Sequence, residues 1–170
     1  FTDVGLTSTG TPRANSVVNR MFASFPASTA YDSLPAVSFI VPNVFHNTHG
    51  SNEAPYTNAS NDYGTLRANA DSWLRTKLDP YVQWAKTHNS LFVLTFDEDD
   101  RTANNQIATI ITGQRVQQGA YSDRINHYSL LRTLQDAYGL PPLGASATAS
   151  PITNIWNDGT GNQNPTAAFT

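Results

Sequence analysis

Three short apolar segments predict the strands of the protein. Ala36–Val41 is rich in β-branched residues and ends at a Pro-Asn turn, whereas Leu91–Phe96 is apolar almost throughout. Gln106–Thr112 carries four consecutive β-branched residues after Ala and stops at a glycine. Runs of this length and composition, bounded by turn residues, are typical of buried strands. A strand that is apolar at nearly every position is expected to be covered on both faces of its sheet.

Two segments show helical periodicity instead. From Thr65 onward, apolar residues recur about every 3.6 positions as far as Ala85, and Pro80 interrupts this stripe. We therefore predict an amphipathic helix that is broken or kinked near Pro80, with Asp71 as a capping residue or, alternatively, an exposed acid. His127–Tyr138 predicts a second, shorter helix.

The order strand, helix, strand, strand, helix predicts an α/β fold, with a mostly parallel sheet sandwiched by helices. Residues 1–33 are rich in Ser, Thr, Asn and Pro and predict mostly loop, with one helical candidate at Asn15–Phe25. The polar stretch Asn43–Gly64 is long for a structureless loop and is expected to be functional or disordered. We assign residues 1–156 to one portion of a domain and residues 157–170 to a linker-like tail. Neither end has the pattern of a domain edge, so the domain is expected to be incomplete.

The net charge and the absence of cysteine restrict the partners and metal sites that the protein can have. The 170 residues hold 10 Lys and Arg against 13 Asp and Glu, a net charge of −3, so we expect no nucleic-acid partner. There are 0 cysteines, and any metal must therefore be bound by oxygen or nitrogen. Only 14% of residues are charged, which is common in exported proteins, so we expect a secreted or extracytoplasmic location. No apolar run approaches the roughly 20 residues of a membrane span, and Asn58 begins a glycosylation sequon.

Acidic residues follow the second predicted strand directly. Asp97 and Glu98 are the first two of four consecutive acids. Ligands of α/β sheets bind at the carboxyl ends of strands, and carboxylates suit a hard cation. A solvated acidic turn is the alternative, and the pattern alone does not choose between the two.

Histidines supply the remaining candidate chemistry. His46 and His49 follow the first predicted strand and could share a ligand if the segment formed a helical turn, although a surface histidine without a role is the more common case. His127 begins the last predicted helix, where a histidine is as often a cap as a catalyst. His88 is expected to interact with the carbonyl groups that end the long helix.

Several ordered blocks of the chain also resemble one known family. The bacterial phosphoesterases, which include acid phosphatases and phospholipases C, are similar in core fold to alkaline phosphatase. The resemblance covers roughly residues 1–156, and its blocks are Leu34–Asn43 with His49, Asp71–Leu74, Asn89–Asp100 and Asn126–Leu134.

The resemblance implies roles for particular residues. Asp97 and Glu98 match the acidic pair that binds the catalytic divalent metal, whose identity stays open. His49 matches a histidine that contacts the substrate phosphate, and His127 matches the histidine at the start of the last helix. Asn47 stands where the family usually has an aspartate, and it is the second candidate for substrate binding.

The family also carries a Glu-Asn metal motif and a Ser or Thr nucleophile upstream of the matched region, for which residues 1–33 offer no candidate. We therefore expect a metal-dependent hydrolase of phosphate monoesters, of the acid phosphatase type and with an alkaline-phosphatase-like fold. Residues 1–156 would be the C-terminal portion of its domain, and the nucleophile would lie in an N-terminal half of the same polypeptide. This chain alone is then expected to be inactive. The alternatives are a phospholipase C-type phosphodiesterase, or an α/β binding module without catalysis.

Overall fold

The computed structural model describes residues 20–50, 62–99 and 101–157. The chain divides into two compact units, residues 1–77 and 78–170, and each is described by itself. The tail from residue 158, the sequon at Asn58 and residues 15–19 of the helical candidate lie outside the described residues. None of the described helices is long and apolar enough to cross a membrane.

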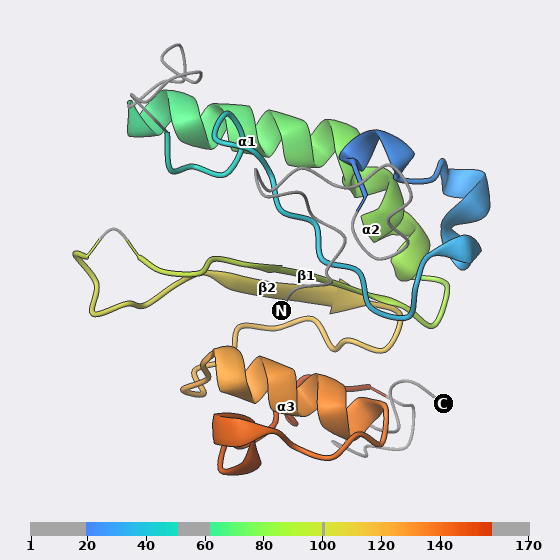
Figure 1. The fold of residues 1–170 in the computed structure, drawn as a ribbon, viewed down its shortest axis with the longest axis vertical. Coiled ribbons are helices and arrows are strands. Elements are labelled where there is room, and N and C mark those ends of the chain that lie inside the picture. Colours follow the sequence, from blue (N-terminus) through green and yellow to red (C-terminus); the bar gives the residue numbers. More distant parts are fainter. Residues whose placement is uncertain (1–19, 51–61, 100, 158–170) are drawn as a thin grey trace. The chain divides into compact units, whose positions relative to one another are not determined.

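The first unit is organised by α1, Tyr63–Lys77, coloured green in Figure 1. Asp62 caps the helix because its Oδ2 accepts the backbone N–H of Thr65 at 2.7 Å. This hydrogen bond to Thr65 holds the pKa of the Asp62 carboxyl below its usual value. Leu66 and Ala70 form the buried side of the helix. Asp71 is not a cap; it is an exposed acid that pairs with Arg75 at 3.0 Å.

Two short 3-10 helices, Phe22–Ser24 and Ser28–Ser33, belong to the same unit. Their aromatic side chains cluster with one from α1, and the ring of Phe22 lies 5.1 Å from that of Trp73. Tyr31 is buried at the second 3-10 helix. Among the described residues of Asn15–Phe25, only Phe22–Ser24 is helical, and it forms a single 3-10 turn rather than an α-helix.

The predicted strand Ala36–Val41 is wrong. The segment has no strand structure, and Phe39 and Val41 are 86% and 87% exposed. A strand needs a neighbouring strand that satisfies its backbone N–H and C=O groups, and the sheet of the described residues contains only strands from the second unit. Its β-branched composition is therefore insufficient by itself.

The second unit contains a two-stranded sheet of β1, Leu91–Thr95, and β2, Thr109–Gly113. The strands are antiparallel, and the register pairs Leu91 with Gly113 and Thr95 with Thr109. The prediction of a mostly parallel sheet is therefore not met by the described strands. The connection between them forms a loop, whereas a parallel pair requires a crossover, usually a helix. Both strands are only partly buried.

Helices flank this ribbon, as an α/β class requires. α2, Asp79–Ala85, contacts both strands and begins after the break that Pro80 predicts. α3, Asn126-capped and spanning His127–Ala137, supplies Leu130 to the core. The core consists of Ile152, Ile155 and Trp156, which pack against Leu91, Ile111, Val116 and Leu130. The mixed helix and strand content agrees with an α/β protein, while an alkaline-phosphatase-like fold stays a prediction.

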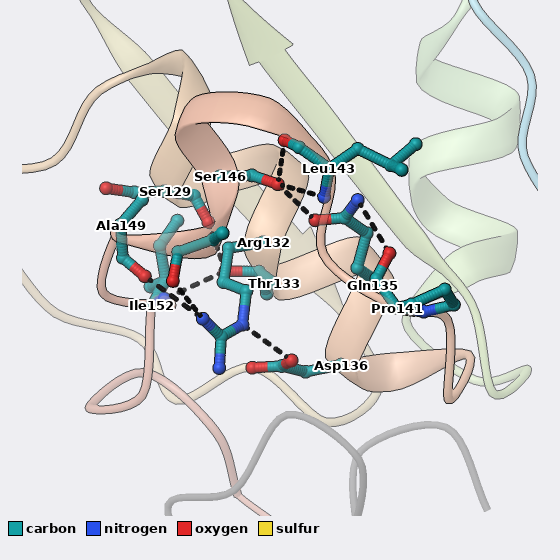
Figure 2. Close-up of polar contacts among 11 residues, drawn as sticks. Ser129, Arg132, Thr133, Gln135, Asp136, Pro141, Leu143, Ser146, Ala149 and Ile152 are labelled. Atoms are coloured by element: carbon teal, nitrogen blue, oxygen red, sulfur yellow. Dashed lines mark hydrogen bonds and ion pairs between the residues drawn. The ribbon is translucent and has the colours of Figure 1, made fainter.

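Buried polar contacts fasten α3 to the chain that follows it (Figure 2). The fully buried Ser146 hydroxyl donates to Gln135 Oε1 at 2.7 Å. The Thr133 hydroxyl oxygen accepts the backbone N–H of Ile152 at 2.8 Å. Each of these buried polar groups therefore has a partner, and the bonds join α3 to the segment after it.

Candidate functional site

The acidic pair lies directly after β1, as the sequence predicts. Asp97 and Glu98 are both exposed. Neither carboxylate makes a hydrogen bond or ion pair with any residue in the described part of the chain. Four carboxylate oxygens at this strand end are therefore available to a ligand.

Asp99 has a different role from the two acids before it. Its carboxylate accepts the backbone N–H groups of Arg101, Ala103 and Asn105 at 2.8–2.9 Å. In return, the Asn105 side-chain oxygen accepts the Asp99 N–H at 2.9 Å. Partial desolvation acts to raise the pKa of Asp99, but these N–H donors outweigh it and the pKa is lowered. Asp99 therefore folds the loop after the acidic pair, and its oxygens are already occupied.

The first residue of α3 reaches the same strand end. His127 Nε2 lies 2.9 Å from the main-chain oxygen of Asp97. A carbonyl oxygen can only accept, so Nε2 carries the proton and a neutral ring keeps its lone pair on Nδ1. Asn126 fixes the helix start, since its side chain accepts the Ser129 N–H at 3.0 Å. The second unit thus fixes an oriented imidazole against the main chain of the first residue of the acidic pair.

The other predicted residues lie on a loop of the first unit. His49 Nδ1 bonds the carbonyl oxygen of Gly50 at 2.8 Å, which leaves its Nε2 as the remaining polar atom. The Asn47 side-chain oxygen accepts the His49 N–H at 2.9 Å, so this amide shapes the loop. Thr48 has a φ of 70°, which is incompatible with a helical turn between His46 and His49. The condition for these two histidines to share a ligand is therefore not met.

The carboxylate oxygens of Asp97 and Glu98 are the type of ligand that a hard divalent cation prefers. Such ions take six or more oxygen ligands, and Asp97 and Glu98 supply only some of them. Within the ranges that the structure describes, no three His, Asp or Glu side chains gather closely enough to hold a metal ion. Further ligands are needed to complete such a site.

The sequence predicted the role of His88 but not those of Asp99 and Asn105. His88 Nδ1 lies 2.9 Å from the carbonyl oxygen of Trp84, which confirms its predicted contact with the end of a helix. The loop-forming roles of Asp99 and Asn105 were missed, because a run of acids gives no sign of which one accepts backbone N–H groups. The repeated Asn at 104 and 105, which tolerates positive φ, was the available signal for a tight turn.

The chain is similar in sequence to proteins that are named as phosphatases. It is 42% identical over 137 residues to a phosphatidylinositol-3-phosphatase of Mycobacterium tuberculosis, a match that covers 81% of this chain and 41% of the relative. It is 28% identical to an acid phosphatase of Aspergillus fumigatus, across 82% of this chain and 30% of the relative. The chain thus spans less than half the length of these curated relatives.

No solved structure matches the chain significantly. The sequence matches the Phosphoesterase family over residues 7–141, which is most of its length and includes the acidic pair and His127. On this match, and on its relatives, the chain belongs to the Phosphoesterase family.

Proposed function

We propose that this chain is part of an exported phosphatase that hydrolyses phosphate monoesters with a divalent metal ion. A further segment of a longer polypeptide would supply the nucleophile and the remaining metal ligands. The observation that carries the proposal is the hydrogen bond of His127 to the Asp97 main-chain oxygen, in a chain of the Phosphoesterase family. The two carboxylates of the acidic pair have no partner among the described residues. Three relatives named as phosphatases favour monoesters over a phospholipase C-type reaction on diesters.

Asp97 and Glu98 would hold the metal ion. When bound, the ion would lower the pKa of a coordinated hydroxyl and offset the charge that develops on the phosphoryl oxygens. The exposure of both carboxylates and their lack of partners among the described residues support this assignment. Asp99 is excluded from the ligand set because its oxygens already accept three backbone N–H groups.

His127 would act beside the acidic pair. Its Nε2–H is engaged by the Asp97 carbonyl, so Nδ1 is the atom that would take up or return a proton. A histidine whose other nitrogen donates to a carbonyl has a fixed tautomer and ring orientation, which a proton-transferring group needs.

His49 would hold the substrate phosphate or protonate the leaving group. Its ring is oriented in the same way, by the bond of Nδ1 to the Gly50 carbonyl, so Nε2 is the atom that would reach the substrate. Asn47 would support it by fixing the loop, and its side-chain N–H₂ could still contact the phosphate. Protonation by a histidine would favour acidic to neutral pH.

The test is hydrolysis of a generic aryl phosphate by the longer polypeptide, with and without a chelator. We expect the chelator and Asp97→Asn each to reduce kcat at least about 100-fold. Asp32→Asn is the matched control, because Asp32 is an exposed aspartate of the first unit. Undiminished turnover by Asp97→Asn would exclude the metal role, and no turnover by the wild type would favour a binding module without catalysis.

A further inference from the structure

A second candidate site lies in the first unit, and none of the residues assigned above lines it. It is a surface pocket of about 260 Å³ formed by α1 and the loop that carries His46. At about 30 Å³ per water molecule, this is room for about eight waters, enough for a small anion with part of an attached group. Its lining residues are His46, Asn69, Ser72, Trp73, Thr76 and Lys77.

The lining carries a positive charge without a compensating acid. Successive residues of an α-helix are about 100° apart, so the five lining residues of α1 fall on one stripe. Asp71 lies on the other side of the helix, where it pairs with Arg75. Lys77 makes no ion pair within the described part of the chain. Its ammonium group is thus available to a negatively charged ligand.

His46 adds an imidazole ring whose tautomer follows from its hydrogen bond. Its Nδ1 lies 2.9 Å from the side-chain oxygen of Asn43, and that oxygen also accepts the Phe45 N–H at 3.2 Å. The second contact identifies the Asn43 atom as the acceptor, so Nδ1 donates and a neutral ring keeps its lone pair on Nε2. The ring also stacks on Trp73 at 5.7 Å, which fixes its plane.

The other polar side chains of the lining, Asn69, Ser72 and Thr76, are neutral. The side chains of Asn69 and Ser72 have no partner among the described residues. The Thr76 hydroxyl is engaged, because it donates to the Ser72 carbonyl at 2.7 Å. The pocket therefore offers one cation, two free polar side chains and one acceptor nitrogen.

We propose that this pocket binds an oxyanion that also carries a hydroxyl group, of which hydrogen phosphate is the simplest. The negative charge would lie against Lys77, and the P–O–H group would donate to His46 Nε2. Sulfate has no such proton at neutral pH and would leave this acceptor without a donor. The site needs no metal ion, and it is independent of the proposed function.

The experiment is a titration of the 170-residue chain with inorganic phosphate in EDTA, followed by NMR of the tryptophan indole N–H groups. The chain has 3 tryptophans, so Trp84 and Trp156 of the second unit are internal controls. We expect the Trp73 signal to shift, and sulfate to bind about tenfold more weakly than phosphate.

Variants separate the pocket from the acidic pair. Lys77→Met should weaken phosphate binding about tenfold. The matched control is Lys86→Met, because Lys86 is the only other lysine and bonds Gln83 at 3.1 Å instead. Asp97→Asn should leave the Trp73 shift intact. The proposal is overturned if Trp73 does not respond, if Lys77→Met and Lys86→Met behave alike, or if sulfate binds as tightly as phosphate.

Discussion

His127 Nε2 lies 2.9 Å from the main-chain oxygen of Asp97, a residue 30 positions earlier in the chain. The contact joins the start of α3 to the residues that follow β1, and the Asn126 cap fixes that helix start. Because the acceptor is the main-chain oxygen of Asp97, this hydrogen bond can persist when the Asp97 carboxylate binds a ligand. The imidazole orientation is therefore built into the fold of the second unit.

His127→Ala should impair hydrolysis by the longer polypeptide without unfolding the chain. We expect kcat to fall about 100-fold, because a positioned proton-transferring group contributes at least that much. The free energy of unfolding should change by about 0.5 kcal/mol or less, since His127 is exposed. The measurements are steady-state kinetics on an aryl phosphate and a denaturant titration.

His88→Ala is the matched histidine control for this variant. His88 stacks on Trp84 at 4.4 Å at the end of α2, away from the acidic pair in sequence and in hydrogen bonding. Its loss should leave kcat unchanged. Equal kinetic effects of the two substitutions would contradict the role assigned to His127.

Asp99 should make the stability of the chain depend on pH. Its folded pKa is lower than the ordinary value of 3.8, so its contribution is complete above the unfolded value and is lost as pH falls through the folded pKa. Asp99→Asn should therefore lower the Tm at neutral pH, and its difference from the wild type should narrow below about pH 4. A difference that widens toward acid pH would contradict this account.

Asn105→Ala tests the same loop without a change of charge. It removes the oxygen that accepts the Asp99 N–H at 2.9 Å. The Tm should fall at neutral pH as it does for Asp99→Asn, which would identify a loop-forming role rather than a loss of charge. An unchanged Tm would remove Asn105 from this loop.

Thr133→Val should destabilise the second unit by about 1–3 kcal/mol. Valine has nearly the same shape but cannot accept the backbone N–H of Ile152, which would then be buried without a partner. Thr133→Ser retains the hydroxyl and should lose less. Denaturant titration of the three proteins measures the difference. A valine variant as stable as the wild type, with a less stable serine variant, would show that methyl packing and not this bond is what matters.

Gly113→Ala should disrupt the edge of the sheet. A Cβ at this position would meet the main-chain oxygen of Ser90 and the side chain of Leu91, directly across from it in the ribbon. The backbone must shift, which should cost about 1–3 kcal/mol. Gly139→Ala serves as a contrast, because a Cβ there meets no atom within 4 Å and only its φ of 62° opposes the change.

Local patterns predicted α1, α2, α3 and two of the strands well. The break near Pro80, the short helix at His127–Ala137 and the strand at Leu91–Thr95 follow from proline geometry, periodicity and β-branched composition. Ala36–Val41 had the same composition but is not a strand, because strand formation also depends on a neighbour that no local pattern reveals.

The candidate site was predictable only in part. The position of Asp97 and Glu98 after β1 follows from the sequence, and so does the start of α3 at His127. Their contact through a backbone carbonyl does not, because it depends on how β1 and α3 pack. Nor could the sequence separate Asp99 from its neighbours, since three backbone N–H groups select it only once the loop is folded.

The most direct test of a metal-dependent phosphatase site is anomalous scattering from crystals of the longer polypeptide soaked with Mn²⁺ and phosphate. The account predicts an anomalous peak bound by the carboxylates of both Asp97 and Glu98, with phosphate bound to that ion. An active phosphatase whose only metal peak lies elsewhere, with these two carboxylates unbound, would contradict it.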